Sequence, residues 1–282
     1  MNEISKEKYI KIGLYVAAGI SLLILPIIVL WVGINGIGAI SWDFLTQSTY
    51  KLDQGGIFPQ IVGSLYLVAL CTLFSAPLGI ASAIYLSEYA PDNIITQTVR
   101  FFTETLASLP SVVLGLFGLE VLVWEFHLGY SLLSGGIALT FLSLPWIIRA
   151  SEEAIKVVPK EYKEASLALG ASKWQTIIRV VIPASLPGII TGVLLGMGKA
   201  IGETVVVWMT AGSGLEAFLP RTIQSPTSSL PVYIYILAKE SRTASGLQHA
   251  YGASLVLILM FMAISVTALL LRNHFLKKLS GR

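Results

Sequence analysis

Six long runs of mostly apolar residues constrain this chain more than any other feature. A helix needs about 20 apolar residues to cross the hydrocarbon core of a bilayer, which is about 30 Å thick, and each run is close to that length. The runs are Ile12–Gly33, Ile61–Tyr85, Phe101–Val123, Ser131–Ile148, Leu186–Thr210 and Ala253–Leu271. We therefore predict an all-α integral membrane protein with six transmembrane helices.

The composition agrees with a membrane protein and excludes several other classes. Of the 282 residues, 55% are hydrophobic and 12% are charged, whereas about 25% of the residues in a typical soluble domain are charged. The high hydrophobicity and the net charge of only +3 exclude an intrinsically disordered chain. Cys71 is the only cysteine, which excludes a disulfide scaffold. The dispersed basic residues form no cluster for nucleic acid.

The first apolar run follows three lysines, so a cleaved signal peptide is an alternative to a membrane span. The run from Ile12 to Gly33 is longer than the apolar region of a signal peptide, and no small-residue cleavage site follows it. We therefore expect a retained first helix.

Lysine and arginine are concentrated on the cytoplasmic side of membrane proteins, so their distribution predicts the orientation. With the N-terminus in the cytoplasm, the inside segments hold fourteen of these residues and the outside segments hold four. We therefore expect both termini in the cytoplasm. The predicted segments are a cytoplasmic N-terminus (1–11), the first helix (12–33), an external loop (34–60), a transmembrane domain (61–271) with a cytoplasmic loop (149–183) and an external loop (211–252), and a cytoplasmic tail (272–282). Pro231 is placed to open a short helix over Val232–Glu240.

The long cytoplasmic loop has the pattern of two short helices. Pro159 is placed to begin the first helix and Gly170 to end it. One face of that helix carries four residues at the spacing i, i+3, i+4, i+7: Tyr162, Ala165, Ser166 and Leu169. Ser172 and Gln175 form a capping box that begins the second helix, which Pro183 is expected to end.

Two interpretations of this loop follow from its residues alone. In the first, the loop is an amphipathic segment that lies on the lipid headgroups. In the second, the small apolar face of its first helix, surrounded by charged side chains, inserts into a groove on a soluble partner.

The loop also resembles the EAA signature of the permeases of ABC importers. Glu164–Ser166, three residues, Gly170, nine residues and Val180–Pro183 match the pattern EAA–x3–G–x9–I–x–LP with its spacing intact. Three positions depart mildly, namely Ser166 for Ala, Val180 for Ile and Ile182 for Leu. In that family the loop is the coupling helix that seats in a cleft of the ATPase subunit. The coupling residues that the resemblance implies are Tyr162, Glu164, Ala165, Ser166, Leu169 and Gly170.

Further stretches resemble phosphate permeases of the PstA type. They are Gly55–Ile57, Ile84–Pro91, Leu109–Gly118, Ala165–Gly170 with Trp174–Thr176, and Gly202–Thr204. Two positions depart: Lys199 stands where these permeases usually have Arg, and Val205-Val206 stands where they have Ala-Pro. The second departure is closer to the sister permease of the PstC type, which stays as an alternative together with a permease for another oxyanion.

The resemblance implies a fold and a set of partners. The fold is that of a type I ABC importer permease (MetI-like), with a core of five helices and a peripheral first helix. The implied function is to provide the pathway for inorganic phosphate by alternating access. The implied partners are a PstC-like sister permease, a dimer of a PstB-like ATPase and a PstS-like phosphate-binding protein. Because the sequence has no P-loop, ATP and Mg²⁺ are expected on the ATPase, with no cofactor, metal or catalytic residue on this chain.

Ionisable residues fall inside the predicted spans, where each costs about 2.5–3.5 kcal/mol at mid-bilayer. Lys199 and Glu203 are four residues apart, so they are expected to share a helix face and to pair. They either orient helices as a buried ion pair, or Lys199 helps an anion pass while Glu203 limits its binding. Glu104 lies near the cytoplasmic end of its span. Arg149 ends the fourth span as either a positively charged anchor or a substrate ligand.

Small residues recur in the fifth span and predict close packing of helices. They are Gly188, Gly192, Gly196, Gly198 and Gly202. The contact is expected either within this chain's own bundle or with the sister permease. Pro110 is expected to kink the third span because it removes one backbone hydrogen bond.

Two other classes of membrane protein fit the sequence less well. A secondary anion transporter or channel would need no such loop, and is more often built from inverted repeats and broken helices. A membrane-embedded enzyme would need a cluster of His, Asp or Cys residues near one face, and His127, His249 and His274 lack metal-ligand spacing.

Overall fold

The structure is a computed structural model that describes residues 3–51, 54–212, 219–241 and 243–279. Side chains are described for these residues except 3–9, 51, 271 and 274–279. Most side chains of the predicted N-terminal segment (1–11) and tail (272–282), with that of His274, therefore lie outside the described residues.

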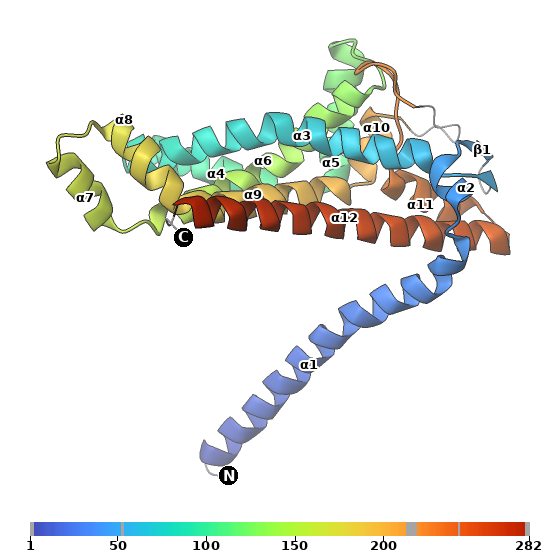
Figure 1. Ribbon diagram of the computed structural model, residues 1–282, viewed down its shortest axis with the longest axis horizontal. Coiled ribbons are helices and arrows are strands. Elements are labelled where there is room, and N and C mark those ends of the chain that lie inside the picture. Colours follow the sequence, from blue (N-terminus) through green and yellow to red (C-terminus); the bar gives the residue numbers. More distant parts are fainter. Residues whose placement is uncertain (1–2, 52–53, 213–218, 242, 280–282) are drawn as a thin grey trace.

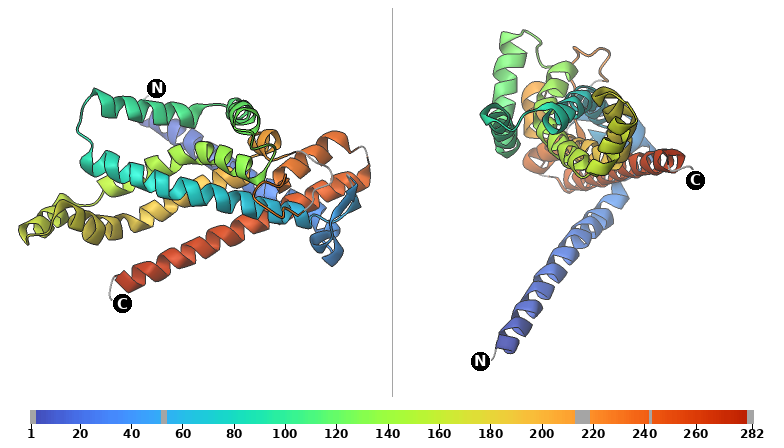
Figure 2. Two further views of the ribbon diagram at one scale, coloured as in Figure 1. Left: turned by 90° about the horizontal axis from the view of Figure 1, so that it is seen from above. Right: turned by 90° about the vertical axis from the view of Figure 1, so that its left-hand side faces the viewer.

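Four long helices lie side by side and form a bundle (Figure 1). They are α3 (Phe58–Ile84), α6 (Leu132–Lys156), α9 (Ile182–Ile201) and α12 (Ala244–Leu279). A further helix, α1 (Glu3–Gly36), contacts α12 and extends away from the bundle (Figure 2). Among the described residues, five helices are long and apolar enough to cross a membrane, or six if one bent pair counts as a span.

The third predicted span, Phe101–Val123, is not one continuous helix. It is divided into α4 (Ile94–Ser108) and α5 (Ser111–Phe117), and the π-helical segment η3 (Gly118–Glu125) continues α5. The two parts are bent by 102° relative to each other. The break falls at Pro110, where only a kink is expected from the sequence. Because a residue before proline avoids the helical region, Leu109 is extended (φ −63°, ψ 136°) and α4 ends there.

The fifth predicted span, Leu186–Thr210, is also divided. α9 ends at Ile201, Gly202–Thr204 interrupt the helix, and α10 (Val205–Thr210) follows. Toward the N-terminus, α8 (Lys173–Thr176) and the π-helical segment η4 (Ile177–Val181) run directly into α9. The expectation that Pro183 ends the second loop helix is therefore wrong, because Pro183 lies in the first turn of α9, where its missing N–H is tolerated.

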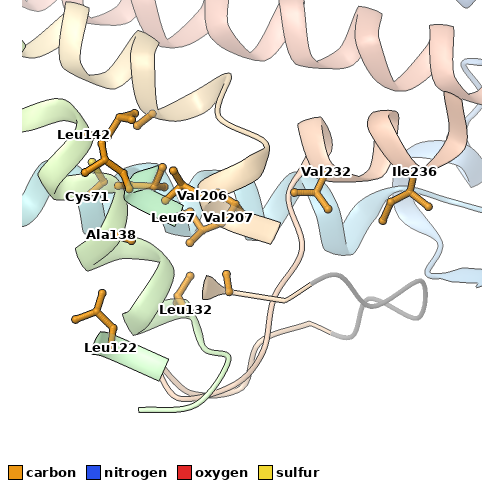
Figure 3. Packing of buried hydrophobic residues seen from close by; sticks show 14 residues of the cluster. Leu67, Cys71, Leu122, Leu132, Ala138, Leu142, Val206, Val207, Val232 and Ile236 are labelled. Carbon is orange, nitrogen blue, oxygen red and sulfur yellow. The ribbon is translucent and has the colours of Figure 1, made fainter. Parts of the chain in front are cut away.

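The largest buried apolar cluster joins α3, α6, α10 and α11 (Figure 3). Its labelled side chains include Leu67, Cys71, Leu142, Val206 and Val232. Hydrogen bonds cross the same region: Cys71 Sγ donates to Ser143 Oγ at 3.4 Å, and Ser143 Oγ donates to the Gly196 carbonyl at 3.1 Å. Because buried polar groups need partners, these bonds fix the relative positions of α3, α6 and α9.

Short elements cover one end of the bundle. They are the 3₁₀ helix η1 (Ile37–Ala39), α2 (Trp42–Thr46), the antiparallel strands β1 (Thr49–Lys51) and β2 (Gln54–Gly55), and α11 (Leu230–Glu240). The helix expected at Val232–Glu240 is α11, which begins at Leu230 with Ser229 as its N-cap and Pro231 in its first turn. One apolar cluster joins the elements: Phe44, Ile57, Leu230, Tyr233 and Leu237. The described parts of the two segments that the sequence predicts as external loops thus meet in this cluster, and we call these short elements the cap.

Recurrent glycines of α9 face α6. An ideal Cβ atom on Gly188 would lie 2.4 Å from Cβ of Ala154, and one on Gly192 would lie 2.8 Å from Cβ of Ala150. These distances are shorter than any normal contact, so only glycine permits this approach of the two helices. Gly188 and Gly192 therefore make their close contact within this chain's own bundle, which is one of the two alternatives given by the sequence.

The remaining glycines of the pattern have different surroundings. An ideal Cβ on Gly196 would lie 2.7 Å from the Ile147 side chain of α6, and one on Gly198 would lie 3.2 Å from the Phe261 ring of α12. Gly202 is exposed in the break between α9 and α10. The glycines of this pattern therefore lie at the contact of α9 with α6, at its contact with α12, and in the break after α9.

The close approach of α6 and α9 can be tested by filling it. Gly192→Val places a branched side chain in the contact and should destabilise the bundle by about 1–3 kcal/mol, the usual cost of overpacking. Gly19→Val is the matched control, because nothing lies within 4 Å of a Cβ at Gly19. The midpoint temperature of unfolding in detergent, followed by intrinsic fluorescence, should fall only for the first variant. Equal midpoints for both would contradict the packing.

Candidate functional site

The loop between α6 and α9 is a compact helix–turn–helix at the end of the bundle opposite the cap (Figure 1). Its first helix, α7 (Lys160–Ala168), begins after Pro159. Gly170 follows it with φ +84°, a left-handed conformation that favours glycine. The capping box is present: Ser172 N donates to Gln175 Oε1 at 2.9 Å, and Gln175 N donates to Ser172 Oγ at 3.2 Å. Local sequence signals thus set the shape of this loop.

The helix α7 presents its apolar face outward. None of its residues is buried, and Tyr162 and Leu169 are 58% and 90% exposed. Glu164 and Ala165 are exposed too. Ser166 differs, because its hydroxyl shares a hydrogen bond of 2.9 Å with that of Thr176 and joins α7 to the next helical segment. The predicted face therefore offers two large apolar side chains to the surroundings.

The loop rests on the π-helical segment η2 (Tyr85–Tyr89), which follows α3. Lys163 of α7 forms an ion pair with Glu88, and the Lys173 ammonium lies 4.6 Å from the centre of the Tyr89 ring. No spacing rule in the sequence indicates these partners, although Ile84–Pro91 is one of the stretches that resemble phosphate permeases. In the structure, Glu88 and Tyr89 of this stretch contact the loop through Lys163 and Lys173.

Glu104 and Arg149, both expected in the pathway, form an ion pair between α4 and α6. Arg149 Nε also lies 3.2 Å from Glu153 Oε1. A cavity of about 290 Å³ opens beside this pair, between α4 and α6, and Thr103 and Trp146 contribute to its lining.

Sequence reasoning missed a second ion pair at the same cavity. Arg100 Nη2 of α4 lies 3.0 Å from Glu152 Oε1 of α6, and Lys156 Nζ lies 2.6 Å from the same oxygen. Glu152 is buried. The i, i+4 spacing of Arg100 and Glu104 places both on one face of α4, but it does not indicate their partners on α6.

Lys199 and Glu203 do not pair, contrary to expectation. Among the described residues, no ion pair within 4.0 Å joins them. The expectation assumed a continuous helix, but α9 ends at Ile201, so Glu203 no longer follows the α-helical spacing. Glu203 is buried and its Oε1 accepts a hydrogen bond from Val205 N at 3.2 Å, while Lys199 is exposed.

The two interrupted spans contact each other through their short halves. α5 packs against α10, and an ideal Cβ on Gly115 would lie 2.9 Å from Met209 Sδ and 3.4 Å from Val206 Cα. One on Gly118 would lie 2.7 Å from Thr210 Cγ2. The break at Gly202–Thr204 therefore immediately precedes the contact between the interrupted spans, and Glu203 is in that break.

Comparison with known proteins gives the family. Residues 75–281 match the family model described as a binding-protein-dependent transport system inner membrane component. A probable phosphate transport system permease protein PstA of Methanocaldococcus jannaschii is 36% identical, with 91% of each chain covered. PstA of Haemophilus influenzae is 36% identical over 71% of each chain. The probable ABC transporter permease protein YqgI of Bacillus subtilis is 35% identical, with 88% of each chain covered.

Solved structures share the fold. A chain of an inward-facing MetNI methionine ABC transporter has a TM-score of 0.62 and 18% identity, and the match covers 76% of this chain and 93% of that one. A chain of a bacterial alginate ABC transporter in complex with its alginate-bound periplasmic protein has a TM-score of 0.63 and 16% identity, covering 98% and 96%. Broken helices are more usual in secondary transporters, but here they occur within the fold of an importer permease. The chain is a multi-pass membrane permease and belongs to the family of binding-protein-dependent transport system inner membrane components.

Proposed function

We propose that this chain is the permease subunit that provides the pathway for inorganic phosphate in an ATP-driven importer. The observation that carries the proposal is the outward-facing apolar surface of α7, formed by Tyr162, Ala165 and Leu169 and held on the bundle by the Lys163–Glu88 ion pair. The relatives named as phosphate transport system permeases support phosphate as the substrate.

The proposed partners follow from this surface and from the family. A PstB-like ATPase dimer, which binds ATP and Mg²⁺, receives α7 in a groove, as amphipathic helices are commonly received. A PstC-like sister permease completes the pathway, and a PstS-like binding protein delivers phosphate on the side of the cap. In this orientation α7, α8 and both termini face the cytoplasm, in agreement with the distribution of lysine and arginine.

The proposed transport step is a two-state change that the partners bias. Binding of ATP closes the ATPase dimer and moves α7, and the pathway opens outward to accept phosphate. Lys199 provides a positive charge for the anion near the break in the fifth span. Glu203 is buried in that break, and its negative charge keeps the anion from binding too tightly for release.

The docking surface predicts a specific loss of assembly. Leu169→Asp puts a charge at the most exposed apolar position of the loop and should weaken binding of the ATPase about thirtyfold, as expected for a residue at the centre of an interface. Leu167→Asp is the matched control, since Leu167 is 48% exposed on the other side of the same helix. Co-purification of the ATPase and its binding constant are the measurements. Equal binding by both variants would place the docking surface elsewhere.

The substrate role of Lys199 predicts a loss of transport without a loss of assembly. Lys199→Ala should abolish ATP-dependent uptake of labelled phosphate into proteoliposomes that hold the complete transporter and binding protein, because the positive charge near the break in the fifth span is lost. Lys199→Arg keeps the charge and should retain uptake. Competition by unlabelled phosphate, but not by sulfate, should accompany the activity. Normal uptake by the alanine variant would remove Lys199 from the pathway.

A further inference from the structure

The half-helix α4 is only loosely packed on the bundle. Thr96 is its one buried residue, and several large apolar side chains point away: Ile94, Ile95, Phe101 and Phe102 are each more than 60% exposed. The cavity of about 290 Å³ separates part of α4 from α6. Leu106 is the α4 side chain that packs against the main apolar cluster, so apolar packing holds α4 mainly at that position. In Figure 2, α4 lies at the edge of the bundle.

Two ion pairs also hold α4 on α6. Arg100 pairs with Glu152, and Glu104 pairs with Arg149. Arg100 and Glu104 are four residues apart and share one face of α4. Arg149 and Glu152 are three residues apart and share one face of α6. We call these four residues the charge clasp.

The α6 members of the charge clasp each have a second partner within α6. Glu152 also pairs with Lys156, and Arg149 also pairs with Glu153. Removing one partner of a buried charge is normally very costly because an uncompensated charge remains. Glu152 is buried and keeps Lys156 as its partner when α4 moves away, while the exposed Arg149 keeps Glu153. The clasp can therefore open without leaving either charge alone on α6.

Arg100 also connects α4 to the contact beneath the coupling loop. Its Nη2 donates to the Leu86 carbonyl of η2 at 3.1 Å. Two residues further along the chain, Glu88 forms the ion pair with Lys163 of α7. One polar contact therefore joins α7 to η2 and another joins η2 to α4, and the backbone of η2 connects the two.

The other end of α4 is free to act as a hinge. Leu109 and Pro110 are both extended, with ψ 136° and 135°, and are exposed. Few loop residues are enough to absorb a rotation between two rigid elements. Beyond this hinge, α5 packs on α10.

From these contacts we infer that α4 is a moving gate helix, that opening the charge clasp accompanies the transport cycle, and that Arg100 is the positioning residue that relays the motion of α7 to α4. The inference rests on the proposed function, because the cycle in question is the ATP-driven transport cycle described there. It assigns to Arg100, Glu104, Arg149 and Glu152 a mechanical role, in place of a role as ligands of the anion.

The first experiment separates coupling from assembly in the complete reconstituted transporter. Arg100→Glu should lower the amount of phosphate imported per ATP hydrolysed by about tenfold, within the usual range of coupling between sites, while the ATPase stays bound. Arg100→Lys keeps a positive charge and an N–H donor for Glu152 and the Leu86 carbonyl, so it should retain most of the ratio. A ratio unchanged in Arg100→Glu, or a loss in Arg100→Lys as large as in Arg100→Glu, would overturn the role of Arg100.

The second experiment measures the motion itself. Spin labels are placed at Thr98→Cys on α4 and Val157→Cys after α6, both exposed positions, in a Cys71→Ser background. Trapping the transporter with ATP and vanadate should change the distance between the labels by several ångströms. Labels at Leu78→Cys and Val157→Cys report on α3 and α6 as the control and should not change. Equal distances in both states for the first pair would overturn the gate.

A third measurement keeps the two hypotheses apart. In the assembled transporter without nucleotide, Arg100→Ala with Glu104→Ala should broaden the Thr98–Val157 distance distribution, whatever the transported substrate is. An unchanged distribution would show that the charge clasp does not hold α4. If wild-type proteoliposomes instead import no phosphate with ATP, the proposed function fails, while a broadened distribution would still support the clasp.

Discussion

Close packing against α6 holds this permease together. Lipid is as apolar as a helix surface, so helices in a bilayer associate mainly through tight contacts and internal hydrogen bonds. Glycine permits both approaches to α6: ideal Cβ atoms on Gly79 of α3 and Gly192 of α9 would lie 2.7 Å from the Ile147 side chain and 2.8 Å from that of Ala150. α6 also leads into the coupling loop and carries half of the charge clasp. The one long central helix thus positions every element to which a function is assigned.

The features that the sequence predicted correctly are those that neighbouring residues determine. The apolar runs predicted the membrane helices, and Pro159, Gly170 and the Ser172–Gln175 capping box predicted the shape of the loop. The bend at Pro110 was predicted in its position but only as a kink, and the interruption at Gly202–Thr204 was not predicted, because apolar content measures the length of a run and not its continuity. The pairing of Lys199 with Glu203 was wrong for the same reason. The Arg100–Glu152 pair depends on how α4 and α6 meet, which no local pattern records.

The structure gives the coupling loop two connections to the membrane part of the chain. One runs through the ion pair of Lys163 with Glu88 and reaches α4 by way of Arg100. The other is covalent, since α8 and η4 continue into α9. Beyond their breaks, the two affected spans meet again where α5 packs against α10. Under the proposed function, motion of the loop therefore reaches the same contact by two routes.

The covalent connection works as a lever arm. From Lys173 to Ile201 the helical path has 29 residues, which is about 43 Å at a rise of about 1.5 Å per residue. By elementary geometry, a tilt of about 5° at the loop would shift the far end of a rod of about that length by roughly 4 Å. Apolar atoms in contact are only about 3.5–4.0 Å apart, so under the proposed function a rotation of this size at the loop is large enough to move Glu203 out of its present packing.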